Sequence, residues 1–271
     1  MASLSKYGLI AGNGKFPFLV LEAARSQGID MVVAAIKEET FPEIEQHAKT
    51  VHWMSLGQLG KLIKTFKSEG VNRAIMAGQV KHKQIFSSIV PDLKMIQLLA
   101  GLATKNTDSL IGGVAKMLEA EGIHLMDSTL FLRPLLPEPG VLTKRVPSEE
   151  EQLDLDYGYK IARELGRLDL GQSVVVSDGA CVALEAMEGT DAVMERAASM
   201  VNGRVLRVVK LAKPNQDLRF DVPVIGPATV RLMSRLKASA LAIEARKTLM
   251  IDREELIREA DAVGIAIVAV E

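Results

Sequence analysis

The stretch YGLIAGNGKFPFLVLEAARSQG, residues 7–28, joins an apolar run, a loop with two glycines and a long amphipathic run. The apolar run YGLIAG is typical of a strand, and PFLVLEAARSQG predicts a helix that ends at Gly28. Gly12 and Gly14 lie where the strand passes into the helix. A glycine turn at this place lets backbone N–H groups at a helix start face an anion. The stretch therefore predicts the first strand, loop and helix of an α/β domain.

The following residues repeat this alternation of strands and helices. The runs DMVVAAI, TVHWMSL and NRAIMAGQV predict strands, GQLGKLIKTFKSEG predicts a helix that ends at Gly70, and IHLMDSTLFL predicts a later strand. Strands that alternate with helices in this way favour a parallel sheet with helices on its faces. We therefore predict a Rossmann-like N-terminal domain over residues 1–133.

A proline-rich segment follows this predicted domain. PLLPEPG, residues 134–140, has three prolines in seven positions. Because proline fixes φ and lacks an N–H donor, this segment cannot continue a helix or a central strand. We predict a linker over residues 134–147. Residues 148–271 then mix helices with extended segments, two of which flank an Asp-Gly turn at residues 178–179. They predict a second, mixed α/β domain, which we expect to be the catalytic one.

Composition limits the kind of protein. The 271 residues are 48% hydrophobic and 25% charged, which is ordinary for a globular chain, and the net charge of -1 shows no basic field for nucleic acid. The single cysteine, Cys181, cannot form an internal disulfide, which fits a reducing cytoplasm. No apolar run approaches the roughly 18 residues of a membrane span. We expect no signal peptide in MASLSKYGLI, and hence a cytoplasmic protein.

The glycine loop has several interpretations. A dinucleotide fingerprint, G-x-G-x-x-G, needs a third glycine where this chain has Pro17, and no acidic residue stands clearly at the ribose-binding spacing. A NAD-dependent reductase is therefore the less favoured alternative. Gly12 and Gly14 fit a loop that contacts a phosphate or nucleotide, and they also fit a tight turn without a ligand. The loop AGQVKHK, residues 77–83, follows a predicted strand, so Lys81 is either a phosphate contact or a solvated basic residue.

A second group of polar residues lies in ALEAMEGTDAV, residues 183–193. Glu185, Thr190 and Asp191 come together where a predicted strand ends and a helix begins. Helix capping by Thr190 and a favourable charge of Asp191 in the first turn explain part of the pattern. Glu185 ends an apolar run, so an ordinary solvent-exposed position does not account for this glutamate. All three are candidate substrate contacts.

The stretch AKPNQDLRFDVPVIGP, residues 212–227, has the densest charge pattern. Its polar side chains are Lys213, Gln216, Asp217, Arg219 and Asp221. If the segment is extended, Asp217, Arg219 and Asp221 share one face, because side chains alternate along a strand. Two carboxylates with a cation between them suit a Mg²⁺ site that also contacts a phosphate. A solvent-facing strand with compensating charges fits the same spacing.

Four motifs together resemble the LpxI family of UDP-2,3-diacylglucosamine pyrophosphatases over nearly the whole chain: GLIAGNGKFP, AGQVKHK, EGTDAV and KPNQDLRFDVPVIGP. The last motif is the specific one. The resemblance implies a Mg²⁺-dependent hydrolase of lipid A biosynthesis. Such an enzyme cleaves the pyrophosphate of UDP-2,3-diacylglucosamine by metal-assisted attack of water on the α-phosphorus. The products are UMP and 2,3-diacylglucosamine 1-phosphate (lipid X).

The resemblance also implies roles for particular residues. Asp221 would be the catalytic residue and would share the metal with Asp217. Substrate contacts would come from Lys213 and Gln216, from the backbone of Gly12 and Gly14, and from the charge of Lys81. A homodimer is implied as well, and an amphiphilic substrate implies peripheral association with the cytoplasmic face of the inner membrane. The main alternative is a non-catalytic module that binds nucleotide-sugars or lipids.

Overall fold

The computed structural model describes residues 6–80, 90–102, 107–214 and 216–271, which fold into two compact units. The N-terminal unit comprises the chain up to Leu132 together with Leu218–Phe220, and the C-terminal unit comprises Arg133–Asp217 and Asp221–Glu271. The predicted fold class, a Rossmann-like parallel-sheet domain followed by a mixed α/β domain, is confirmed. Residues 218–220 belong to the N-terminal unit although they come late in the sequence.

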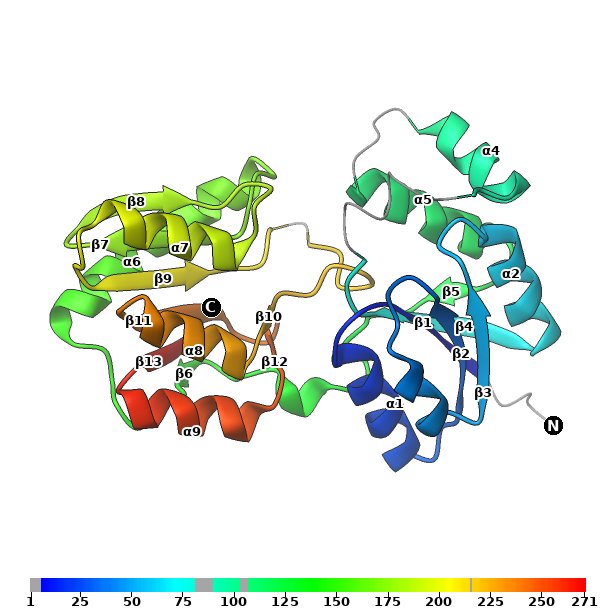
Figure 1. Ribbon diagram of the computed structural model, residues 1–271, viewed down its shortest axis with the longest axis horizontal. Coiled ribbons are helices and arrows are strands. Elements are labelled where there is room, and N and C mark those ends of the chain that lie inside the picture. The colour runs from blue at the N-terminus through cyan, green and yellow to red at the C-terminus, as the bar shows by residue number, and fades with distance from the viewer. Residues whose placement is uncertain (1–5, 81–89, 103–106, 215) are drawn as a thin grey trace. The chain divides into compact units, whose positions relative to one another are not determined.

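The N-terminal unit is built on a five-stranded parallel sheet with the order β3-β2-β1-β4-β5 (Figure 1). Its elements are β1 (Lys6–Ala11), α1 (Phe16–Ser26), β2 (Met31–Ile36), η1 (Pro42–Gln46), β3 (Thr50–Met54), α2 (Leu59–Ser68), β4 (Val71–Ala77), α4 (Leu93–Gly101), α5 (Thr107–Ala120) and β5 (His124–Leu125). The central strand β1 pairs with β2 on one side and with β4 on the other.

Helices cover the N-terminal sheet, and all six residues of its strand β2 are buried, as expected for a parallel strand covered on both faces. The helices α2, α4 and α5 share one apolar core with Val32, Ala34 and Ile36 of β2. The helix α1 lies apart from that group (Figure 1) and buries Val20 and Leu21. Because all the strands of this sheet are parallel, the loops that follow them lie at the same edge.

The predicted strand IHLMDSTLFL, residues 123–132, is wrong beyond its third residue, because β5 covers only His124–Leu125. Two residues later the chain turns. Asp127 Oδ1 accepts hydrogen bonds from the Thr129 amide and from Thr129 Oγ1, both at 2.7 Å. Such a side-chain-to-backbone turn competes with strand pairing. The apolar pattern alone did not reveal it.

The C-terminal unit contains a six-stranded mixed sheet with the order β6-β13-β11-β9-β7-β8 and a short parallel pair, β10-β12. Its elements are η2 (Arg133–Leu135), β6 (Gly140–Val141), α6 (Glu149–Arg167), β7 (Ser173–Ser177), β8 (Ala180–Leu184), α7 (Thr190–Met200), β9 (Leu206–Lys210), β10 (Val224–Ile225), α8 (Pro227–Arg235), β11 (Ala238–Glu244), β12 (Leu249–Met250), α9 (Arg253–Val263) and β13 (Ala266–Val270). The strands β9, β11 and β13 are parallel, whereas β7 runs antiparallel to β9.

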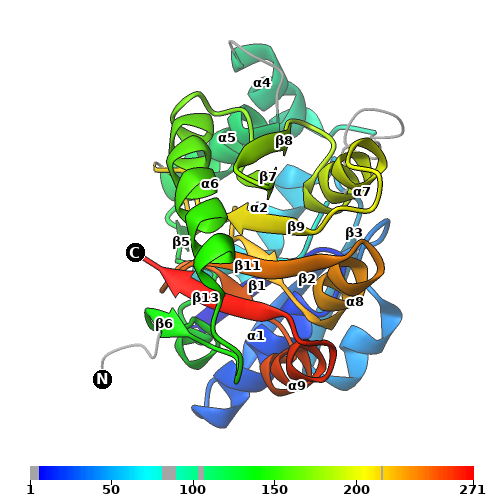
Figure 2. The same ribbon diagram turned by 90° about the vertical axis from the view of Figure 1, so that its left-hand side faces the viewer.

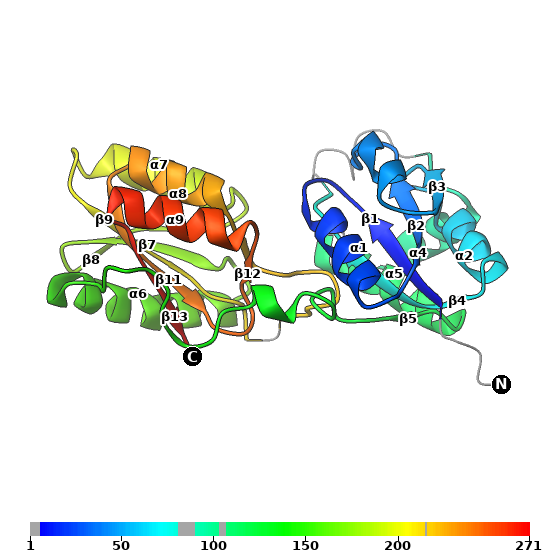
Figure 3. The same ribbon diagram turned by 90° about the horizontal axis from the view of Figure 1, so that it is seen from below.

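Two separate apolar cores flank the C-terminal sheet. The helix α6 packs on one face through Leu155 and Leu165, and α7, α8 and α9 pack on the other (Figures 2 and 3). The predicted Asp-Gly turn is confirmed: Asp178 and Gly179 both have positive φ, 50° and 76°, and join β7 to β8. In the ranges that the structure describes, no helix is long and apolar enough to cross a membrane.

Residues 134–147, which we predict as a linker, carry structure of their own. The short helix η2 lies at their start, and β6 pairs antiparallel with β13 of the C-terminal sheet. Thr143 Oγ1 accepts a hydrogen bond from the Ile267 amide at 3.0 Å, and the Lys144 amide donates to Asp261 at 2.8 Å. The later part of the stretch is thus held against β13 and α9.

Candidate functional site

The glycine loop lies at the carboxyl edge of the N-terminal sheet. The chain passes outward from β1 to β2 and β3, and then returns to β4 on the other side of β1, so the strand order reverses between β1 and β4. Ligands of open α/β sheets bind outside the carboxyl ends of the strands at such a reversal. The loop that follows β1 therefore occupies the position where a doubly wound fold binds an anionic ligand.

Two glycines allow the loops after β1 and β4 to touch through their backbones. Asn13 and Gln79 exchange hydrogen bonds, from Asn13 N to Gln79 O at 2.8 Å and from Gln79 N to Asn13 O at 3.0 Å. A Cβ on Gly12 would lie 2.8 Å from Gln79 O, and a Cβ on Gly78 would lie 2.6 Å from Asn13 O. Gly14 has a different reason to be glycine, because its φ is +91° and the space around it is open.

The loop after β2 supports the same edge of the sheet. Thr40 Oγ1 donates to Ala11 O at 2.5 Å and accepts from the Ile36 amide at 3.0 Å. Asn13 Nδ2 donates to Glu39 O at 3.1 Å, and Glu39 itself is buried. An acidic residue thus does stand beside the glycine loop at the end of β2, although the sequence spacing did not identify it.

A serine beyond β5 brings part of the late charged stretch to this unit. Ser128 Oγ lies 2.6 Å from Met76 O and 2.7 Å from Arg219 O, and the Ser128 amide donates to Leu218 O at 2.9 Å. Met76 is near the carboxyl end of β4. The backbone of Leu218 and Arg219 is therefore fixed beside the carboxyl end of β4 in the N-terminal unit. Sequence reasoning missed Ser128, which carries no motif.

The stretch around Asp217–Asp221 is a turn, so the expectation that Asp217, Arg219 and Asp221 share one face of a strand is wrong. The Asp221 amide donates to Asp217 O at 3.0 Å, which closes a single turn. The physical reason is that the carbonyls of this turn bond to Ser128 rather than to a neighbouring strand. Asp217 and Asp221 nevertheless stay close in the chain, at the two ends of that turn.

Lys213 and Gln216 lie in the C-terminal unit, just before that turn. Gln216 Oε1 accepts a hydrogen bond from the Lys213 amide at 2.6 Å, and Lys213 Nζ contacts Asp169 Oδ1 at 2.6 Å. Gly166, at the end of α6, allows close approach because a Cβ there would lie 3.4 Å from Lys213 Cα. The structure thus brings these two predicted substrate contacts together. Lys81 lies outside the described residues.

The predicted residues Glu185 and Thr190 also meet. The Glu185 amide donates to Ser173 O at 2.9 Å, and Ser173 Oγ lies 2.9 Å from Thr190 Oγ1. Thr190 Oγ1 lies 3.5 Å from Glu185 Oε1, and Glu185 Oε2 accepts from the Gln172 amide at 3.3 Å. Glu185 is only 6% exposed. The carboxylate is therefore held inside the unit by the ends of β7 and β8, as its place in an apolar run suggested.

Our capping interpretation of Thr190 is wrong by one residue. The N-cap of α7 is Gly189, which has φ 86° and no capping side chain, so Thr190 is the first helical residue. Its hydroxyl is directed to Ser173 and Glu185 instead of to the helix backbone. Asp191 does lie in the first turn of α7, as predicted.

Lys210, which sequence reasoning missed, lies among the predicted carboxylates. It ends β9 opposite Ser173 and is 8% exposed. Burial lowers the pKa of Lys210, while the negative charges of Glu185, Asp191 and Asp221 oppose that shift. The signal that could have found it is a lysine inside the otherwise apolar run VVKLA. The C-terminal unit thus gathers three predicted carboxylates around a buried ammonium group.

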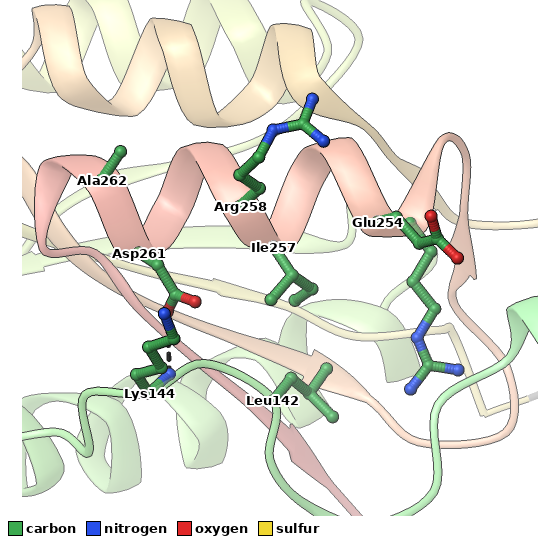
Figure 4. A pocket seen from close by; sticks show the side chains of 8 residues that line it. Leu142, Lys144, Glu254, Ile257, Arg258, Asp261 and Ala262 are labelled. Atoms are coloured by element: carbon green, nitrogen blue, oxygen red, sulfur yellow. Dashed lines mark hydrogen bonds between the residues drawn. The ribbon is translucent and has the colours of Figure 1, made fainter.

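A surface pocket elsewhere in the C-terminal unit does not coincide with these residues. It has a volume of about 850 Å³ and lies along α9 (Figure 4). Its lining residues are Leu142, Lys144, Arg253, Glu254, Ile257, Arg258, Asp261 and Ala262. Charges of both signs surround the apolar side chains of Leu142 and Ile257. Its lining includes none of the predicted site residues that the structure describes.

Comparisons with known proteins point to one family. The model of the LpxI N-terminal domain matches residues 6–135, and the model of the LpxI C-terminal domain matches residues 138–268. A curated relative is the UDP-2,3-diacylglucosamine pyrophosphatase LpxI of Caulobacter vibrioides. It is 32% identical over 278 residues, which cover 99% of this chain and 98% of the relative.

Two solved structures show a weak likeness to this chain. The biotin carboxylase domain of Hydrogenobacter thermophilus 2-oxoglutarate carboxylase has a TM-score of 0.27 and 13% identity, over 65% of this chain and 35% of that one. Phosphoribosylglycinamide synthetase from Anaerococcus prevotii has a TM-score of 0.28 and 12% identity, over 66% and 38%. Such values carry no argument about function.

Proposed function

The chain belongs to the LpxI family, and from this membership we propose that it hydrolyses the pyrophosphate bond of UDP-2,3-diacylglucosamine in lipid A biosynthesis. The products would be UMP and 2,3-diacylglucosamine 1-phosphate. The observation that carries the proposal is the 32% identity to an LpxI pyrophosphatase over 99% of this chain. A match over both units, rather than over one of them, supports a shared activity rather than a shared fold.

The proposed reaction needs a water molecule in line with a phosphorus and compensation of negative charge. The oxygen of water would form a bond to the α-phosphorus, and the bond from that phosphorus to the bridging oxygen would break. We propose that Asp221 orients this water and accepts its proton. Lys213 and Gln216 would contact phosphate or sugar oxygens. The backbone amides near Gly12 and Gly14, at the start of α1, would offer donors to an anion.

The donor groups fit Mg²⁺ that binds together with a phosphate. The described residues contain no group of three or more His, Cys, Asp or Glu side chains that could hold a metal ion. Mg²⁺, however, is usually bound by one or two carboxylates, with waters and substrate phosphates completing its coordination. Asp217 and Asp221, at the ends of one turn, supply two carboxylates. We propose that they hold Mg²⁺, which would neutralise charge on the phosphate oxygens.

The proposed hydrolysis can be measured as release of UMP when the 271-residue protein is incubated with UDP-2,3-diacylglucosamine and Mg²⁺. We expect the wild type to release UMP. Treatment with EDTA should abolish this activity, and added Mg²⁺ should restore it. Asp221→Asn should lower kcat by at least about 100-fold, because general acid–base groups contribute that order of rate. In ¹⁸O-labelled water, the label should enter UMP.

The control is Asp156→Asn, an exposed aspartate on α6 whose substitution should leave kcat unchanged. Full activity of Asp221→Asn would remove that residue from the proposed mechanism. A wild type that binds substrate but releases no UMP would favour the binding-module alternative. Peripheral attachment to the inner membrane and a homodimer, which the family resemblance implies, stay predictions.

A further inference from the structure

Lys210 makes a specific contact with the segment that follows Asp221. It is the last residue of β9, and its Nζ donates a hydrogen bond to Val224 O at 2.9 Å. Val224 begins β10, three residues after Asp221. A buried side chain from the central part of the sheet is thus tied to the backbone that carries the proposed catalytic aspartate.

Hydrogen bonds hold the backbone on both sides of Asp221. On the near side, the Asp221 amide donates to Asp217 O at 3.0 Å. On the far side, the Leu249 amide of β12 donates to Pro223 O at 2.8 Å, and Lys210 donates to Val224 O. Of these three contacts, the bond from Lys210 is the one that a side-chain substitution can remove.

The charge of Lys210 acts on the same group of residues. Glu185, Asp191 and Asp221 all exert an electrostatic attraction on its ammonium group, which lies almost entirely out of solvent. Charges interact more strongly when they are shielded from water. An uncharged side chain at position 210 would leave these carboxylates to repel one another, and the orientation of Asp221 would change.

We propose that Lys210 is a positioning residue of the active site, which holds Asp221 in place through its bond to Val224 O and through its charge. This inference rests on the proposed function, because it assigns Lys210 a role in that reaction. A misplacement of a reacting group by about 1 Å can lower a rate about 100-fold. The effect of removing Lys210 is therefore expected in kcat more than in KM.

The same strand offers a matched control. Arg207, three residues earlier on β9, is also buried and pairs with the buried Asp154 at 3.2 Å. Its partners lie on α6 and at the β7–β8 turn, and its guanidinium also reaches Asp178 at 3.5 Å. Arg207→Met thus removes a buried cation from β9 without touching the segment after Asp221.

The experiment compares Lys210→Met, Lys210→Arg and Arg207→Met in the full chain. Steady-state kinetics of UMP release give kcat and KM, and hydrogen exchange gives the protection of the Asp221 amide. For Lys210→Met we expect kcat to fall about 100-fold, KM to change less than about threefold, and the amide to exchange faster. Lys210→Arg should recover kcat to within about tenfold of wild type. Arg207→Met should lower stability and keep kcat within about twofold.

Several results would overturn the proposal. These are an unchanged kcat or an unchanged Asp221 exchange in folded Lys210→Met, a Lys210→Arg variant as slow as Lys210→Met, or an equal loss of kcat in Arg207→Met. If Lys210→Met does not fold, Lys210→Met with Glu185→Gln is compared with Glu185→Gln alone. A further loss of kcat supports positioning, and equal kcat contradicts it. If the wild type releases no UMP, the proposed function fails, and hydrogen exchange still decides whether Lys210 holds Asp221.

Discussion

At the scale of single residues, Glu151 shows how a buried charge is kept in the C-terminal unit. Arg145 donates two hydrogen bonds to it, at 2.6 and 3.0 Å, and the Ser148 amide donates a third at 2.8 Å. Burial alone would raise the pKa of Glu151, but the contacts with Arg145 and Ser148 outweigh burial and hold it at about 2. Ionised Glu151 therefore ties the start of α6 to the chain that precedes it.

This pKa predicts a dependence of stability on pH. The folded value of about 2 lies below the ordinary value of 4.5, so ionised Glu151 stabilises the fold above about pH 4.5. That stability is lost as the pH falls from about 4.5 to about 2, and amounts to about 3 kcal/mol. We expect the free energy of unfolding of Glu151→Gln to approach that of wild type over this range. Urea unfolding followed by circular dichroism measures it, and a constant difference at all pH values would contradict it.

At the scale of elements, glycines determine how the loops after β1 and β4 are arranged at the carboxyl edge of the N-terminal sheet. Gly14 and Gly78 have nearly the same φ, +91° and +93°, but their surroundings differ. A Cβ on Gly14 would meet nothing within 4 Å, whereas a Cβ on Gly78 would lie 2.6 Å from Asn13 O. The two positions therefore separate the cost of a positive φ from the cost of forcing two loops apart.

We expect Gly14→Ala to lower the free energy of unfolding by about 1 kcal/mol, the cost of a positive φ in an L-residue. Gly78→Ala should cost at least about 2 kcal/mol more, because backbone atoms must move. Trp53, the single tryptophan, lies on β3 of the same unit, so its fluorescence in urea reports this stability. Equal costs for the two variants would show that the loops after β1 and β4 do not need their close contact.

At the scale of the whole molecule, the chain completes its N-terminal unit with residues from its second half. Leu218–Phe220 belong to that unit, whereas the residues before and after them belong to the other. Ser128 provides the contacts, through its amide to Leu218 O and its hydroxyl to Arg219 O. The N-terminal unit is therefore not formed by a continuous piece of sequence.

Because of this arrangement, substitutions at residues 218–220 should change the stability of the N-terminal unit. Replacing Leu218, Arg219 and Phe220 together by Gly, Ser and Gly should lower the unfolding free energy reported by Trp53 by about 2 kcal/mol or more, because half-buried side chains are lost. Hydrogen exchange of α6, in the C-terminal unit, should change little and serves as the control. Unchanged Trp53 unfolding would mean that the segment does not stabilise the N-terminal unit.

Much of the fold could be predicted because its signals are local. The alternation of strands and helices and the Asp178–Gly179 turn each depend on residues close together in the sequence. The same holds for the motifs that identify the family. Errors arose where a distant partner decided local structure. The turn at Asp217–Asp221 forms with Ser128 as its partner, and Thr190 bonds to Ser173 instead of capping α7.

By itself, the sequence determined the fold class, the strand–glycine loop–helix start and the family. Only the tertiary structure decided that Leu218–Phe220 complete the N-terminal unit and that Lys210 lies among Glu185, Asp191 and Asp221. The physical reason is that periodicity and turn chemistry act over a few neighbouring residues. Which charges meet depends instead on strand order and on burial, and these follow from the packing of the whole unit.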